Sequence, residues 1–257
     1  MPAAPPKTPC RHEVRTPSEG VTLQKTVFIG YTDVLAAGSR ALLGIDTKQM
    51  KIEYDELNIP DLNNLQPAVT RGIEPDPTEK DFLHLQILNH KYEQCSLVIV
   101  NTVVPADKCH VVANKIMDMC SRGGTERIFL LSAVPVNLPK SLSSRASNPL
   151  FENCRFCEPA TMYESLPITT LIHDHFLNTM LQLINVEGIP TSVLIIPATR
   201  GRGGRASKED GSAQAIALFH DTMHRLMRFS FSLDISLSLV YNQLDSNTKE
   251  NRAMIYA

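Results

Sequence analysis

Apolar residues gather in four short runs, and segments with helical spacing separate them, which predicts a sheet interleaved with helices. The runs are almost wholly apolar instead of alternating, which is typical of strands buried on both faces of a parallel sheet. They occupy residues 25–31, 96–104, 127–134 and 191–197. We therefore expect four buried strands.

Helical segments follow these runs. The first helix is expected at residues 34–44, because Gly30 allows a tight exit from the strand and Asp33 is placed to cap the helix N-terminus. Pro105 suits the first turn of a second helix, whose apolar stripe continues until residue 123. Each helix thus begins shortly after a strand ends.

The helix after Pro105 joins the runs at 96–104 and 127–134, which predicts a βαβ unit with a right-handed crossover and parallel pairing. Two more helices are expected at residues 169–186 and 212–228. The fold class predicted from this pattern is α/β, a three-layer αβα sandwich with a mostly parallel central sheet.

Three segments are less regular. Residues 49–59 alternate and predict a strand, whereas residues 79–92 fit a helix or a strand equally well. Residues 229–241 alternate strictly, as in a strand, but they also carry a helical stripe with Ser232 as a possible N-cap. We favour a helix from about residue 233.

The two ends differ from the body of the chain. Residues 1–22 carry five of the seventeen prolines and little apolar content, which predicts a disordered arm. Residues 23–244 form the α/β domain. Residues 245–257 are expected to be a flexible C-terminal tail, polar at first and apolar over its last four residues.

The apolar end of a polar tail is the most unusual feature of the sequence. Tyr256 offers a rigid ring with one polar group, Ile255 can fill a neighbouring hollow, and the carboxylate of Ala257 can pair with a lysine or with backbone amides. The pattern suggests an anchor for a pocket on another protein. The alternative is a tail that folds back onto its own core.

Composition excludes several classes of partner. The 257 residues carry a formal net charge of −2 without long runs of either sign, which gives no footprint for nucleic acid or anionic lipid. No apolar stretch is long enough to span a bilayer, and residues 1–9 do not resemble a secretion signal. Six cysteines, mostly within or beside apolar runs, fit reduced thiols. We expect the cytosol or the nucleus.

Two loops carry candidate chemistry. Residues 199–205 (TRGRGGR) lie between a strand and a helix, where phosphate-binding loops occur, but the glycine spacing matches no phosphate-binding motif and favours a surface loop. Residues 135–167 form a long proline- and serine-containing excursion over the sheet edge. For Cys154 and Cys157 to bind zinc, the second ligand pair would have to be Cys10 and His12 of the arm, which is a weak pairing, so we favour two thiols.

Histidine pairs and serines give no active site either. His220 and His224 lie one helical turn apart, but a third ligand is missing, so a solvated helix face is favoured over a metal site. His173 and His175 would diverge on a helix. Ser132 lies in a plain context without a nucleophile elbow. We expect no catalytic residue, no metal and no cofactor.

Several segments resemble the proteasome assembly chaperone 1 family. These are the first strand and helix (TVFIGYTDVLAAG), the long helix running into GIPTSVLII, and the tail NTKENRAMIYA. The resemblance extends over most of the chain and is strongest in the last ninety or so residues. The tail motif, hydrophobic-Tyr-X, is its most specific part and covers Ile255, Tyr256 and Ala257.

The resemblance implies a chaperone for assembly of the proteasome core particle. Such a protein forms a heterodimer with proteasome assembly chaperone 2 on the α-subunit ring, and its tail enters a pocket between α subunits, where a lysine pairs with the terminal carboxylate. The alternative is an α/β enzyme resembling a nucleoside phosphorylase, because this class of fold hosts many reactions. That enzyme would need the arginines of residues 200–205 as its anion site.

Overall fold

The computed structural model describes most of the predicted domain. The described residues are 22–45, 52–56 (as backbone only), 65–71, 82–90, 93–136, 150–198, 204–208 and 211–242. Residues 1–21 of the expected arm and the whole expected tail at 245–257 lie outside these ranges.

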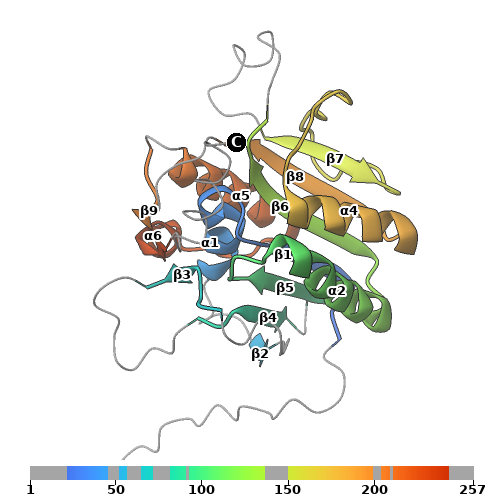
Figure 1. Ribbon diagram of the computed structural model, residues 1–257, viewed down its shortest axis with the longest axis horizontal. Coiled ribbons are helices and arrows are strands. Elements are labelled where there is room, and N and C mark those ends of the chain that lie inside the picture. Colours follow the sequence, from blue (N-terminus) through green and yellow to red (C-terminus); the bar gives the residue numbers. More distant parts are fainter. Residues whose placement is uncertain are drawn as a thin grey trace, which may run out of the picture.

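A seven-stranded sheet forms the middle of the protein (Figure 1). In spatial order its strands are β2 (Ile52–Glu56), β4 (Leu85–His90), β5 (Cys95–Val100), β1 (Thr26–Gly30), β6 (Arg127–Val134), β8 (Thr191–Pro197) and β7 (Phe151–Arg155). The four strands β5, β1, β6 and β8 are parallel neighbours. β4 and β7 run antiparallel to the strands beside them. The sheet is therefore mostly parallel, as predicted.

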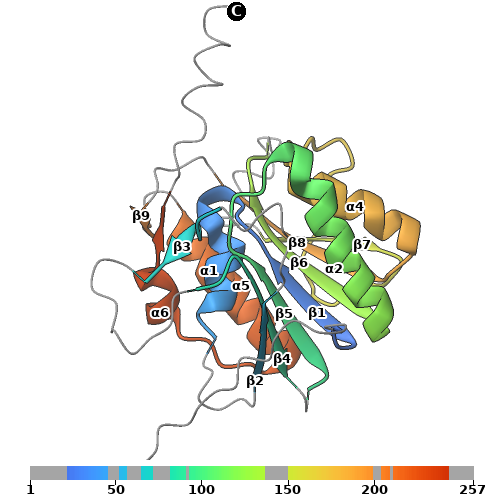
Figure 2. The ribbon, with the colours of Figure 1, turned by 60° about the horizontal axis from the view of Figure 1, so that its bottom comes forward.

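Helices cover both faces of the sheet, which confirms the three-layer αβα fold (Figure 2). The helices α2 (Cys109–Gly123) and α4 (His175–Glu187) pack together on one face. On the other face α1 (Ala37–Leu43) packs against α5 (Ser212–Met227), and the short α6 (Leu233–Ser238) packs against both. Two short 3₁₀ turns, η1 (Val34–Ala36) and η4 (Ala106–Lys108), lead into α1 and α2.

Each central strand is buried on both sides, which explains its unbroken apolar sequence. Val27 and Ile29 of β1 belong to the core under α2 and α4, whereas Phe28 belongs to the core under α1 and α5. The ring of Phe28 stacks on that of Phe129 in β6, with centroids 4.8 Å apart. Alternate residues of one strand therefore hold the two helical layers to the same sheet.

The βαβ prediction is correct in direction but wrong in pairing. β5, α2 and β6 follow one another as expected, and β5 and β6 run parallel. They do not pair with each other, because β1 lies between them and bonds to both. The order of consecutive elements does not show that β1, which comes earlier in the sequence, lies between β5 and β6.

The segments without a clear pattern resolve as follows. Residues 79–92 contain the strand β4, and residues 49–59 contain β2. The helix expected at 169–186 begins only at His175, because Asp174 caps it by accepting a hydrogen bond from the Leu177 N–H at 2.7 Å. The helix expected from residue 233 is α6, and Ser232 caps it as predicted.

A second, three-stranded sheet was not predicted. β10 (Val240–Tyr241) lies between β3 (Val69–Thr70) and β9 (Gly204–Arg205) and is antiparallel to both. Two-residue strands leave too short a pattern to recognise in a sequence. Among the helices in the described part of the chain, none is long and apolar enough to cross a membrane.

Replacing Gly30 by alanine should lower the free energy of unfolding by at least about 2 kcal/mol, the cost of forcing an atom into a packed core. A Cβ at Gly30 would lie 2.4 Å from the backbone oxygen of Gly38 in α1, so strand and helix would have to separate. Urea unfolding measures the loss. Gly124→Ala is the control, since nothing lies within 4 Å of its Cβ and only its positive φ opposes the change, at about 1 kcal/mol. Equal losses for both variants would contradict the close approach.

Candidate functional site

The carboxyl end of β1 is held by a buried carboxylate. Asp33 accepts hydrogen bonds from the backbone N–H of Ala133, at 2.6 Å, and of Gly38, at 3.2 Å. It does not cap the next helix in the expected way, because Leu35 and Ala36 adopt left-handed backbone conformations and turn the chain first. Asp33 instead ties β1 to the end of β6 and to the second turn of the helical segment. Asp33 thus occupies the predicted N-cap position before η1, but its side chain makes no capping hydrogen bond within that turn and bonds to Gly38 of α1.

Three further polar side chains lie beside Asp33. The hydroxyl groups of Tyr31 and Ser132 are 2.7 Å apart, and both side chains are buried. Burial raises the pKa of Tyr31, and the charges of Asp174 and Asp33 raise it further. Burial also raises the pKa of Asp33 and of Asp174. The strands β1 and β6 therefore end on a desolvated acidic cluster formed by Tyr31, Asp33, Ser132 and Asp174.

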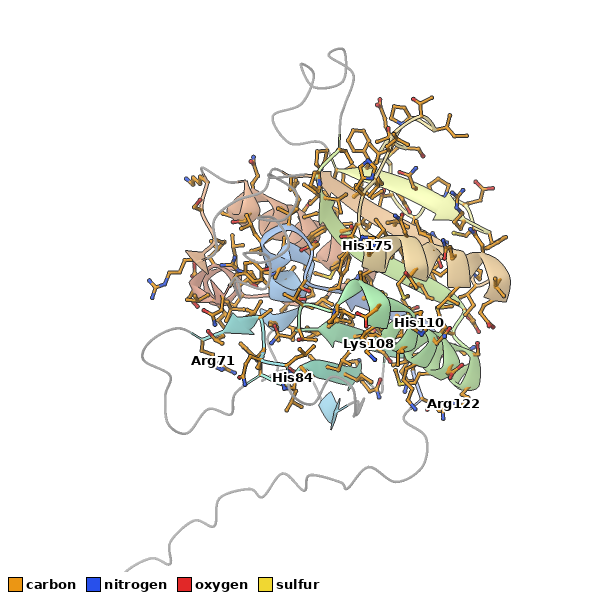
Figure 3. The ribbon with its side chains drawn as sticks, in the orientation of Figure 1. Arg71, His84, Lys108, His110, Arg122 and His175 are labelled. Atoms are coloured by element: carbon orange, nitrogen blue, oxygen red, sulfur yellow. The ribbon has the colours of Figure 1, made fainter. Side chains whose placement is uncertain are left out.

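The acidic cluster lies at the ends of β1 and β6 and contains no activated nucleophile. Ser132 is fully buried and hydrogen-bonded, and burial raises the pKa of the nearby thiol of Cys109 at the start of α2. His110 lies in the first turn of α2 and His175 is the first residue of α4 (Figure 3). Within the described ranges, no group of three histidine, cysteine, aspartate or glutamate side chains could hold a metal ion.

A buried arginine fixes the base of the C-terminal tail. Arg40 of α1 is 1% exposed, and its guanidinium donates to the backbone oxygen of Leu239 at 2.5 Å and to that of Leu35 at 3.3 Å. Its own backbone oxygen accepts a hydrogen bond from Ser236 in α6 at 2.8 Å. The last helix and the residue before β10 are thus tied to the first helix of the fold.

The described chain ends just after this point. Asn242 donates through its backbone N–H to the oxygen of Ala68 at 2.8 Å, and its side chain donates to Thr70 at 3.1 Å. Tyr241 lies close enough to the acidic cluster that burial first, and then the charge of Asp33, raise its pKa. The predicted anchor residues Ile255, Tyr256 and Ala257 lie outside the described residues. Only the base from which the tail leaves is defined.

The loop candidates gain no support as sites. Of the arginines in residues 199–205, only Arg205 is described, and it is exposed on β9. Cys154 and Cys157 are free thiols, as expected. Burial raises the pKa of Cys154 to about 11, which leaves it protonated and unreactive at neutral pH.

The histidine predictions need two corrections. His220 does not lie on a solvated face: its Nε2 is 2.9 Å from the backbone oxygen of Ala41, and its ring stacks on Phe231. The reason is that α5 is covered on one side by the sheet and on another by α1 and α6, so it has more than one buried stripe. His224 is exposed, as expected. His175 begins α4 and His173 precedes it, so the two do not share a helix.

The role of Arg40 was missed, although the sequence carries a signal for it. The segment VLAAGSRALLG contains one charge among small and apolar residues. A solvated helix would show a polar face of several residues. A single arginine in an otherwise apolar helix therefore indicates a buried guanidinium that bonds to backbone oxygens.

Comparisons with known proteins identify the fold. The sequence matches no protein-family model, and it matches no curated protein. Among solved structures, the chain is similar to a protein of unknown function from Thermoplasma acidophilum, with a TM-score of 0.62 and 11% identity over 92% of each chain.

Two structures from Pyrococcus furiosus are also similar. PbaA, described as an archaeal homolog of proteasome-assembly chaperone, gives a TM-score of 0.57 and 14% identity over 91% of this chain and 93% of that one. PbaB, described as an archaeal proteasome activator, gives 0.54 and 13% over 93% and 95%. At such identities the likeness establishes a shared fold that extends over nearly the whole chain.

The acidic cluster should make the protein less stable as the pH rises. Because the pKa values of Asp33 and Asp174 are raised by folding, the folded state binds more protons than the unfolded state above about pH 4, and the free energy of unfolding then falls with pH. Asp174→Asn keeps a residue that can cap α4 but removes one charge, so its decline should be shallower. Urea unfolding at a series of pH values measures this, with exposed Asp118→Asn as the control. Parallel curves for all three proteins would contradict it.

Replacing Arg40 by methionine should lower the free energy of unfolding by about 3 kcal/mol, because two buried backbone oxygens lose their donor. Amide exchange at Val240 and Tyr241 should speed up more than exchange in β1. The control is Arg225→Met, which removes an exposed ion pair with Asp221 and should cost less than about 0.5 kcal/mol. If exchange in β10 is unchanged, Arg40 does not hold the tail base.

Proposed function

We propose that this protein is a chaperone for assembly of the proteasome core particle, acting as a heterodimer with proteasome assembly chaperone 2 on the α-subunit ring. The observation that carries the proposal is the fold shared with PbaA and PbaB over nine-tenths of the chain, since both of those proteins are described by their relation to the proteasome. The hydrophobic-Tyr-X ending adds a second, independent reason.

In this proposal the folded body holds the tail, and the tail makes the contact with the ring. The body fixes the tail base through Arg40 and through the pairing of β10 with β3 and β9. Fifteen residues follow Asn242, and fifteen residues can span at most about 50 Å. Tyr256 and Ile255 then enter a pocket between α subunits, and the carboxylate of Ala257 pairs with a lysine there.

The rest of the proposal concerns the cellular compartment and the lack of enzymatic activity. We propose the cytosol or the nucleus as the place of action, in keeping with the free thiols of the described cysteines. We also propose that the protein is not an enzyme, since Ser132 and the thiols of Cys109 and Cys154 lack the activation that a nucleophile needs.

Deleting residues 255–257 should leave the fold and the heterodimer intact and weaken ring binding by about 3 kcal/mol, roughly 150-fold in Kd, the scale of one buried aromatic anchor. Binding of the purified heterodimer to α subunits, followed by interferometry, measures this. Tyr256→Ala should reproduce most of the loss. One glycine added after Ala257 tests the carboxylate, because it moves the charge without removing a side chain.

Asn251→Ala, in the polar part of the same tail, is the matched control and should bind like the natural protein. Thermal unfolding and size-exclusion chromatography verify that each variant still folds and pairs. Unchanged recovery of α subunits by the deleted protein would remove the anchor from the proposal.

A further inference from the structure

Exposed apolar side chains concentrate in one part of the chain, from the end of β7 to the end of α4. Among the described residues, five of the seven large exposed ones lie between positions 156 and 186, and the other two are on α6. The five are Phe156, Met162, Ile168, Leu171 and Val186. Met162 and Ile168 are fully exposed, at 103% and 102%. Scattered exposed side chains are ordinary, but a concentration of this kind marks an interaction site.

The segment that carries Met162 is held in place by a buried carboxylate. Glu152 of β7 is inaccessible to solvent and accepts hydrogen bonds from the backbone N–H groups of Ala160 and Thr161, at 2.9 and 2.8 Å, and from the Ser192 hydroxyl at 2.6 Å. Burial alone would raise the pKa of Glu152, but these hydrogen bonds and that of the Thr161 hydroxyl outweigh it and lower the pKa. A charged, fully bonded carboxylate thus fixes a chain that presents methionine to water.

The same segment covers the free edge of the sheet. The backbone N–H of Glu152 donates to the oxygen of Glu164 at 3.0 Å, the Ser165 hydroxyl donates to the oxygen of Glu152 at 2.9 Å, and the Leu166 N–H donates to Asn153 at 3.1 Å. A partner therefore cannot add a strand at this part of β7. It has to bind through side chains.

The charges around these apolar residues are mainly acidic. Among the described residues 155–187, Glu158, Glu164 and Glu187 are exposed, and Arg155 is the exposed arginine or lysine. The sequence contains no lysine from residue 141 to residue 207. Lysine is depleted in protein interfaces, whereas methionine and phenylalanine are enriched in them.

We propose that residues 156–171, together with Val186 of α4, form the surface that binds the second chain of the heterodimer, and that the second chain presents an apolar hollow bordered by lysine or arginine. This inference rests on the proposed function for the identity of that chain, which is proteasome assembly chaperone 2. The apolar side chains supply the buried area, and the three glutamates supply the orientation and the preference among partners.

A second copy of this chain fits the same surface poorly. A symmetric contact would place the surface against itself and bring the acidic borders of two copies together. Like charges across an interface oppose association, and here they would disfavour the self-pair relative to a partner with a basic border. The surface also lies on the opposite side of the molecule from α6, which packs beside the tail base (Figure 1). Partner and ring can thus be bound at once.

The test uses the full chain with purified proteasome assembly chaperone 2. Met162→Glu combined with Ile168→Glu should weaken the pair at least 30-fold, as for the loss of central anchors, and should leave the melting temperature unchanged because both side chains are already exposed. The matched control is Leu233→Glu combined with Ile235→Glu, which changes the other exposed apolar pair and should leave the affinity within twofold. Hydrogen exchange should show protection of residues 156–171 in the complex.

Charge reversal provides an independent arm. Glu158→Lys with Glu164→Lys should slow association by at least fivefold at low salt and by less at high salt, since screening weakens the repulsion. The inference fails, while the proposed function stands, if chaperone 2 binds the Met162→Glu/Ile168→Glu and Glu158→Lys/Glu164→Lys variants as well as it binds the natural chain. If the natural chain does not bind chaperone 2, the proposed function fails in its partner and the inference falls with it. Protection of 156–171 by self-association alone would show a second copy as the occupant and overturn the choice made here.

Discussion

The fold depends on the burial of β1 from both sides. Val27 and Ile29 face one helical layer and Phe28 faces the other, and all three are completely inaccessible to solvent. Full burial of one such side chain contributes about 2 kcal/mol, so this one short strand is worth several kcal/mol to the folded state. Because β1 also bonds to β5 and to β6, the two halves of the parallel sheet meet on it.

At the end of such a buried strand the chain leaves the sheet, and polar groups there need hydrogen-bond partners because water cannot reach them. Asp33 accepts hydrogen bonds from the backbone N–H groups of Ala133 and Gly38, and Tyr31 pairs with Ser132. The chain then passes through the left-handed residues Leu35 and Ala36 before α1 begins. Tyr31, Asp33 and Ser132 resemble a catalytic cluster in composition, but their hydrogen bonds connect β1 to β6 and to α1.

Two buried charged side chains hold the segments that we propose to bind partners. Arg40 reaches from α1 to the residue before β10 and so defines where the tail leaves the body. Glu152 reaches from β7 to Ala160 and Thr161 and so defines how the apolar segment beyond them is presented. In both cases the buried charge is hydrogen-bonded to another segment: Arg40 to backbone oxygens, and Glu152 to backbone N–H groups and to the Ser192 hydroxyl. The rigid body thereby positions two parts of the chain at opposite ends of the molecule.

The sequence by itself determined the layers. Continuous apolar runs identified β1, β5, β6 and β8, a helical stripe ended by glycine identified α2, and a second helical stripe identified α5, because burial and backbone geometry act over a few neighbouring residues. The cap formed by Asp174 makes α4 begin at His175, later than the apolar stripe predicted. The tail motif is also a property of the sequence alone, and no described residue tests it.

Only the tertiary structure decided which segments become neighbours. It placed β1 between β5 and β6, buried His220 under α1 and α6, and joined β3, β9 and β10 from three distant parts of the chain. It also turned Arg40 and Glu152 inward, although such residue types are usually solvated. The physical reason is similar for all of these: most of the partners lie tens of residues or more away, and those of Glu152 lie both in a nearby loop and in β8. Spacing along the chain carries no information about contacts that form only when the layers close.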